Sequence, residues 1–149
     1  MANQKNIWHY LTAGFFIFVL IRISQFWLYA TTPINGATWC HGFLGLRTYY
    51  NSGIAFGLPL PNLLLIIFNL LIIIGLVIYW QKFIQTAETT KAWSITLILA
   101  GAFSNLIERI RSGHVLDFFQ VWWLPVFNLA DIFIIIGAIW LIIVCRSKK

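Results

Sequence analysis

Charged side chains are scarce in this sequence, and acidic ones are almost absent. Asp, Glu, Lys and Arg together make up 9% of the 149 residues, and only four residues are acidic, whereas 60% are hydrophobic. The mean hydropathy of +0.85 lies far above that of soluble domains. This balance excludes an ordinary soluble protein. We therefore predict an integral membrane protein formed by a single domain, residues 1–149.

Cysteine and histidine are too few and too scattered for a metal site or for thiol chemistry. The two cysteines, Cys40 and Cys145, fall on opposite sides of the membrane in the topology given below, so they cannot form a disulfide with each other. The three histidines have no partner at metal-ligand spacing, and no serine or cysteine has a plausible His or Lys base. We expect no metal and no cofactor, and neither a Ser–His nor a Cys–His hydrolase.

The basic residues lack the arrangement that a nucleic-acid surface requires. Ten Lys and Arg give a net charge of +6, but they form no basic stripe, so we expect no nucleic-acid partner. Their distribution is instead typical of a positive-inside membrane protein. Six lie near the chain ends or in one short loop: Lys5, Lys82, Lys91, Arg146, Lys148 and Lys149.

Four apolar segments approach the length of about 20 residues that crosses a bilayer. Four spans place both chain ends on one side of the membrane. Six positive charges then lie on that side and three on the other, with Arg22 inside the first span, so the bias predicts cytoplasmic termini. We predict an all-α polytopic membrane protein with four transmembrane helices, at residues 7–29, 63–80, 92–110 and 125–144.

The segment 31–61, between the first two predicted spans, is rich in turn residues. It carries the tract Asn51-Ser52-Gly53-Ile54-Ala55-Phe56-Gly57. Its size and its glycines predict a small extracytoplasmic subdomain that is partly β. Because Gly53 and Gly57 allow close backbone approach, the tract is a candidate substrate clamp; the alternative is an ordinary glycine turn.

The only two aspartates, Asp117 and Asp131, both lie in the stretch 101–131. Asp131 is expected about six residues inside the fourth span, with Asn128 on the same face. An ionisable residue at that depth is expensive and therefore predicts a functional role; the alternatives are an interhelical hydrogen bond or an aspartate that lines a pore. Asp117 lies outside the spans, but the loop that carries it can bring it onto Asp131. Two carboxylates that share a site cannot both ionise cheaply, and such a pair can activate water and protonate a leaving amine.

A polar stripe on the third predicted span supports this interpretation. Asn105 and Arg109 are one helical turn apart, and Gly101 lies one turn before Asn105, where a neighbouring helix can approach closely. We expect Asn105 and Arg109 to support the acids rather than to react themselves.

Three stretches together resemble bacterial lipoprotein signal peptidase, also called signal peptidase II. Residues 51–56 (NSGIAF) resemble the N-x-G-x-A-F tract of that family. Residues 101–118 resemble its G-G-A-x-G-N-L-I-D-R…G-x-V-x-D-F block, and residues 127–131 (FNLAD) resemble its F-N-x-A-D block. The three stretches occur in the same order and at matching spacing.

The resemblance implies a four-span aspartic endopeptidase of the bacterial cytoplasmic (inner) membrane. The family cuts prolipoproteins just before a diacylglyceryl-modified cysteine, without metal or cofactor, so the implied partners are these lipid-anchored substrates and membrane lipids. The resemblance implies Asp117 and Asp131 as the catalytic dyad, near the outer face of a monomer. It implies supporting or substrate-binding roles for Asn51, Gly53, Ala55, Asn105, Arg109, Asn128 and Ala130.

The first span departs from the family pattern. The family usually carries D-x-x-[ST]-K there, whereas residues 21–25 read IRISQ, and Ser104 and Glu108 replace a glycine and an aspartate. Our hypothesis is that Arg22, one turn from Gln25, supplies the missing positive charge. Two alternatives stay open: a catalytically inactive protein that binds lipoprotein precursors, and a small proton-coupled carrier that uses Asp131.

Overall fold

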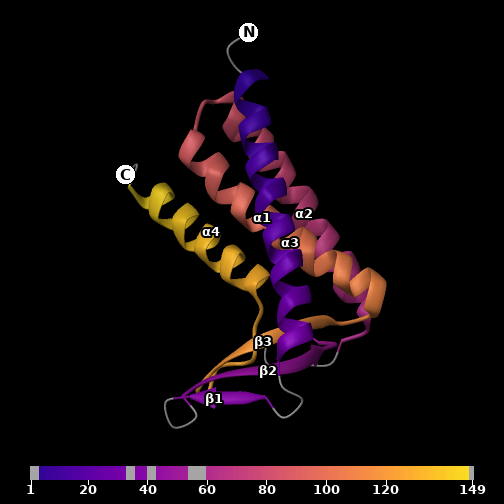
Figure 1. Cartoon of the computed structure of the whole chain (residues 1–149). Helices are drawn as coiled ribbons and strands as arrows, with labels where there is room; N and C mark the ends of the chain where they lie inside the picture. The colour runs from indigo at the N-terminus through magenta and orange to yellow at the C-terminus, as the bar shows by residue number, and fades with distance from the viewer. Residues whose placement is uncertain (1–3, 33–35, 40–42, 54–59, 148–149) are drawn as a thin grey trace.

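Four long helices and one small sheet make up the computed structural model, which describes residues 4–32, 36–39, 43–53 and 60–147 (Figure 1). The helices lie side by side, and the sheet lies at one end of them. The start of α1 and the end of α4 lie at the opposite end (Figure 1). In chain order the elements are α1 (Gln4–Thr31), β1 (Ala37–Trp39), β2 (Leu44–Asn51), α2 (Asn62–Gln85), α3 (Thr89–Ser112), β3 (Val115–Val121) and α4 (Leu129–Arg146).

Three helices, α1, α2 and α4, are long and apolar enough to cross a membrane. The remaining helix, α3, is less apolar, and it packs on α1, α2 and α4, so that several of its polar side chains are buried. Buried polar residues on α3 include Ser94, Thr96, Ser104 and Glu108. Thr96, for example, accepts a hydrogen bond from the indole of Trp80 on α2 at 3.0 Å. The helix that is least apolar is thus the one the others surround.

Close approach of α3 and α4 depends on two glycines. A Cβ atom at Gly101 would lie 2.5 Å from the carbonyl oxygen of Ala130, and one at Gly137 would lie 2.7 Å from the carbonyl oxygen of Ser94. The predicted close approach at Gly101 is therefore present, and it brings the middle of α3 against the first turn of α4. Small residues allow such contacts between helices in a membrane.

The sheet combines strands from two connections: β1 and β2 lie between α1 and α2, and β3 lies between α3 and α4. Its strand order is β1-β2-β3, and both pairs are antiparallel. β1 and β2 come from the segment 31–61, where β structure was predicted. β3 follows α3 and was not predicted as a strand; it pairs with β2 so that Tyr49 lies opposite Asp117 and Asn51 opposite Val115. This pairing fixes Asp117 in a strand rather than in a loose loop.

The helix ends differ from the predicted spans because hydropathy does not report caps. α4 begins at Leu129, whereas the predicted span begins at Pro125. Phe127 is extended and forms a bridge with Phe119, and Asn128 caps the helix. Asp131 therefore lies in the first turn of α4 rather than six residues inside a helix. At the other end, α2 and α3 extend past their predicted spans, and only residues 86–88 connect them.

Replacing Gly101 with alanine should destabilise the fold, because the new methyl group would collide with the backbone of α4. Overpacking of this kind costs about 1–3 kcal/mol, so the thermal unfolding temperature in detergent should fall. Gly75→Ala is the matched control, since nothing lies within 4 Å of a Cβ at Gly75 on α2, and it should leave that temperature equal or slightly higher. Equal unfolding temperatures for the two variants would contradict the packing described here.

Candidate active site

A cavity of about 520 Å³ lies where the helices meet the sheet, and both aspartates line it. Asp117 enters from β3 and Asp131 from the first turn of α4. β2, α2 and α3 supply Asn51, Asn69, Asn105 and Arg109, and Asn128, the residue before α4, completes the polar part of the lining. Polar groups of five elements thus converge on one space.

Asp117 is buried and is held by two asparagine side chains. It is 1% exposed. Its Oδ2 accepts a hydrogen bond from Asn51 Nδ2 at 2.9 Å, and its Oδ1 accepts one from Asn128 Nδ2 at 2.8 Å. Burial raises the pKa of Asp117 to about 7, the negative charge of Asp131 acts in the same direction, and the two asparagine hydrogen bonds oppose the rise. This carboxyl group can therefore hold or release a proton near neutral pH.

Asp131 is fixed by the start of its own helix. Asn128 and Asp131 form a capping box: the Asp131 N–H donates to Asn128 Oδ1 at 3.0 Å, and the Asn128 N–H donates to Asp131 Oδ2 at 3.1 Å. The other carboxyl oxygen, Oδ1, accepts from Asn105 Nδ2 at 2.9 Å. Both oxygens of Asp131 are thus hydrogen-bond acceptors.

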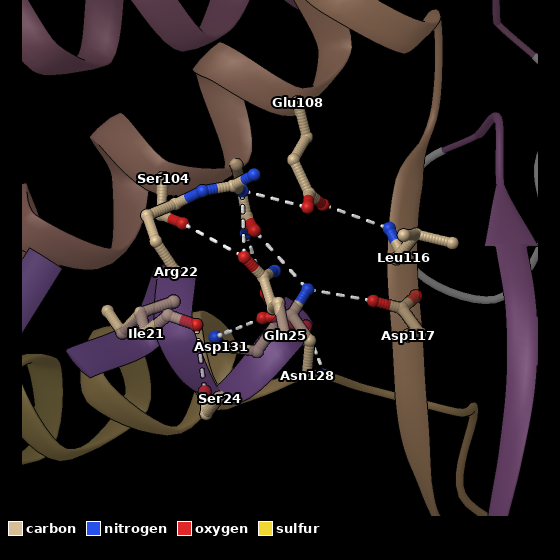
Figure 2. A network of polar contacts seen from close by, with 11 residues as sticks. Ile21, Arg22, Ser24, Gln25, Ser104, Glu108, Leu116, Asp117, Asn128 and Asp131 are labelled. Carbon is tan, nitrogen blue, oxygen red and sulfur yellow. Dashed lines mark hydrogen bonds and ion pairs between the residues drawn. The ribbon is translucent and has the colours of Figure 1, made fainter. Parts of the chain in front are cut away.

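Asn128 links the two aspartates. It is fully buried, and its Nδ2 donates to Asn105 Oδ1 at 3.2 Å as well as to Asp117. Because its Oδ1 is occupied by the backbone of Asp131, the orientation of the amide is fixed (Figure 2). Only a side chain with both a donor and an acceptor can make these contacts.

Arg109 connects the cavity to the tract that follows β2. Its Nη2 donates to the carbonyl oxygen of Gly53 at 2.8 Å, and Gly53 N–H donates to Asn51 Oδ1 at 3.1 Å. Its Nη1 is buried without a hydrogen-bond partner among the described residues. The guanidinium therefore holds the tract 51–53 in place, and its Nη1 keeps a donor that no described residue accepts.

Six of the residues singled out in the sequence line this one cavity: Asn51, Asn105, Arg109, Asp117, Asn128 and Asp131. Gly53 is tied to the cavity through Arg109, and Ala130 is buried where α4 meets Gly101. Ala55 lies outside the described residues. Arg22 is not part of the cavity lining; it contacts Glu108 and Gln25.

Two residues near the site were not recognised as such from the sequence. Glu108 is buried and contacts the strand that carries Asp117, although the sequence indicated only that it replaces an aspartate. Asn69 lines the cavity from α2. The signal in both cases was a polar side chain in an apolar helix. Among the described residues, no group of three or more His, Cys, Asp or Glu side chains could hold a metal ion.

Fold and site together define an integral membrane protein whose two aspartates line one cavity, where its helices meet the sheet. Comparison with known proteins makes the class more specific. The family described as signal peptidase (SPase) II matches residues 13–146. This chain therefore belongs to the signal peptidase II family, a family of membrane proteases.

Individual relatives agree with this assignment. The lipoprotein signal peptidase of Syntrophomonas wolfei subsp. wolfei is 43% identical over 135 residues, which cover 87% of this chain and 89% of that protein. The lipoprotein signal peptidase of Buchnera aphidicola subsp. Schizaphis graminum is 34% identical over 149 residues, covering 94% and 95%. A solved structure described as a bacterial membrane enzyme superposes with a TM-score of 0.82 at 27% identity, covering 95% of this chain and 90% of that one.

The Asp117 carboxyl group should titrate near neutral pH. Its pKa is about 7 in the folded protein against 3.8 for an unperturbed aspartate, so the folded state retains a proton that the unfolded state releases. The stability gained from this proton is complete below the unperturbed pKa of 3.8 and is lost as the pH rises through the folded-state pKa of about 7. ¹³C-labelled aspartate gives only two carboxyl signals in this chain, and the Asp117 signal should have its midpoint near pH 7.

An Asp131→Asn variant serves as the control for this titration. It removes one negative charge beside Asp117, so the midpoint of the Asp117 signal should fall. An Asp117→Asn variant should lose that signal and the matching part of the pH dependence of the unfolding temperature. A midpoint at the ordinary aspartate value in the unmutated protein would contradict the burial described here.

Proposed function

We propose that this protein is an aspartic endopeptidase that removes signal peptides from prolipoproteins, cutting just before the diacylglyceryl-modified cysteine. One observation carries the proposal: both aspartates of the chain line a single cavity, and Asn128 joins them. Membership of the signal peptidase II family and the names of the relatives supply the reaction and the substrate class.

The two carboxyl groups would divide the acid and base roles. Asp117, with its pKa near 7, suits the protonated partner, which hydrogen-bonds the scissile carbonyl and later helps to protonate the leaving amine. Asp131 accepts hydrogen bonds at both oxygens, which suits an ionised carboxylate that takes a proton from the attacking water. The charge on Asp131 in turn disfavours ionisation of Asp117.

The apolar part of the cavity lining supports a lipid-anchored substrate. Phe68 and Ile72 on α2 and Ile135 on α4 line the cavity. Their side chains are 63%, 43% and 54% exposed, which places them on the surface that a membrane would cover. Acyl chains lying between α2 and α4 would bring the neighbouring peptide bond to the depth of the aspartates. In this proposal, Arg109 Nη1 and the tract 51–53 would hold the backbone of such a substrate.

In this proposal α3 is the fourth transmembrane helix, and the active site faces the outside of the inner membrane. The 24 residues of α3, at about 1.5 Å per residue, are long enough to cross the hydrocarbon. The surrounding helices cover its polar side chains. With four spans the two termini lie in the cytoplasm, as the charge distribution predicts, and the sheet lies outside. In this proposal the protein acts as a monomer, since the two aspartates that the reaction needs belong to the same chain.

A cleavage assay tests the reaction. The unmutated protein in liposomes should cut a diacylglyceryl-modified precursor before the lipidated cysteine. Asp117→Asn and Asp131→Asn should each lower the rate by at least roughly a hundredfold, because each removes an acid–base group. Glu88→Gln is the matched control: it neutralises an acid at the far end of α3 and should leave the rate unchanged.

Other outcomes would assign a different function. Binding of the precursor by the unmutated protein without cleavage would identify an inactive binder. Proton-coupled flux that survives in Asp117→Asn would identify a carrier, although the confinement of both aspartates to one end of the helices speaks against a path across the bilayer. Cleavage that persists in either aspartate variant would show that the pair is assigned wrongly.

The two cysteines test the topology. A membrane-impermeant thiol reagent is applied to intact cells, with the outer membrane permeabilised where one is present. It should label Cys40, which follows the first predicted span in the sequence and lies outside the described residues, but not the exposed Cys145 at the end of α4. Lysis should make Cys145 reactive. The variants Cys40→Ser and Cys145→Ser identify the labelled residue. Labelling of both cysteines before lysis would exclude the four-span arrangement.

A further inference from the structure

Arg22 on α1 and Glu108 on α3 form an ion pair that the proposed mechanism does not use. Arg22 Nη1 lies 2.8 Å from Glu108 Oε1, with the side chains 28% and 7% exposed. Arg22 Nη1 also donates to Gln25 Oε1 at 2.8 Å, and Gln25 is 2% exposed. Neither member of the pair lines the cavity. A charge buried this far is tolerated only with a partner, so each residue depends on the other.

The second carboxyl oxygen of Glu108 reaches β3. Glu108 Oε2 accepts a hydrogen bond from the backbone N–H of Leu116 at 3.0 Å, and Leu116 directly precedes Asp117. Figure 2 shows Glu108 lying between Arg22 and the strand. On the other side of Asp117, the N–H of Phe118 donates to the carbonyl oxygen of Phe127 at 3.0 Å. The backbone groups flanking Asp117 are therefore held from outside the β2–β3 ladder.

We infer that Arg22 and Glu108 are positioning residues for the reaction: Arg22 orients Glu108, and Glu108 anchors Leu116 so that Asp117 stays against Asn128 in the cavity. The inference rests on the proposed catalytic role of Asp117. A hydrogen bond to a carboxylate is stronger than one to a neutral acceptor, and the ion pair fixes the direction of its second oxygen. Without this anchor, the backbone beside Asp117 would be held only by β2 and by the hydrogen bonds to Phe127, and Asp117 would shift more easily on the side that faces α3.

Glu108 also acts on Asp117 through its charge. The negative charge of Glu108 raises the pKa of Asp117, and Arg22 lies directly against that charge. The other charged groups that interact with Asp117 are Asp131 on α4 and Arg109 on α3. Removal of the Glu108 charge and removal of the Arg22 charge should therefore shift the pKa of Asp117 in opposite directions.

Kinetics of four variants test the positioning role. Arg22→Met and Glu108→Gln should each lower kcat roughly tenfold at an unchanged KM, since small displacements of a reacting group are costly. Arg22→Lys keeps the charge and should recover most of kcat. Lys91→Met is the matched control, because Lys91 and Glu88 form a similar ion pair, 2.6 Å long, at the far end of α3. It should leave kcat unchanged.

The titration of Asp117 separates positioning from support of the fold. With ¹³C-labelled aspartate, Glu108→Gln should lower the pKa of Asp117, because a negative charge is lost. Arg22→Met should raise it, because the charge of Glu108 loses its counter-ion. A role in stability alone would instead move both values the same way, towards that of an ordinary aspartate, together with the unfolding temperature.

The outcomes also separate this inference from the proposed function. Cleavage by the unmutated protein, with unchanged kcat and Asp117 titration in both variants, would overturn the positioning role and leave the protease assignment standing. No cleavage by the unmutated protein, with opposite shifts of the Asp117 titration in the two variants, would overturn the protease assignment while the control of Asp117 by this ion pair holds.

Discussion

Asn128 is the residue on which the geometry of the site depends. A carboxyl group that is 1% exposed, as Asp117 is, needs donors close by, because burial without them is expensive. Asn128 supplies one to Asp117 and at the same time begins α4 by capping the backbone of Asp131. A single side chain therefore links the strand that carries Asp117 to the start of the helix that carries Asp131.

The location of α3 follows from the same need for donors and partners. This helix carries Asn105, Glu108 and Arg109, which contact the first turn of α4, the strand β3 and the tract after β2. A helix with these residues cannot face lipid along its length, so the more apolar helices surround it. Its lower hydropathy and its central position thus both follow from the polar contacts that it makes around the cavity.

The sequence predicted most of this arrangement, and its errors have physical causes. Long apolar segments dominate hydropathy, so the positions of the helices were predictable. Hydropathy does not distinguish the apolar residues 125–127, which precede α4, from the helix itself. The cap at Asn128, rather than hydropathy, marks where α4 begins. β3 was missed because its partner, β2, lies about 66 residues earlier, as the hydrogen bond from Asn51 to Asp117 illustrates. The convergence of Asn105, Asn128 and both aspartates was predictable from the motifs; the contact between Glu108 and Leu116 was not, since it depends on the register of that strand.

The chain has only four acidic residues, and their hydrogen-bond and ion-pair partners distinguish the two glutamates from the two aspartates. Among the described residues, salt bridges join only Arg22 to Glu108 and Lys91 to Glu88, so each glutamate has a cation. Both aspartates are held mainly by neutral amide donors instead. An ion-paired carboxylate resists protonation because its partner would be left unpaired in a medium of low dielectric constant. A carboxylate held by amides can gain or lose a proton while its neighbours stay in place. The difference in partners thus separates the acids that stabilise the structure from those suited to proton transfer.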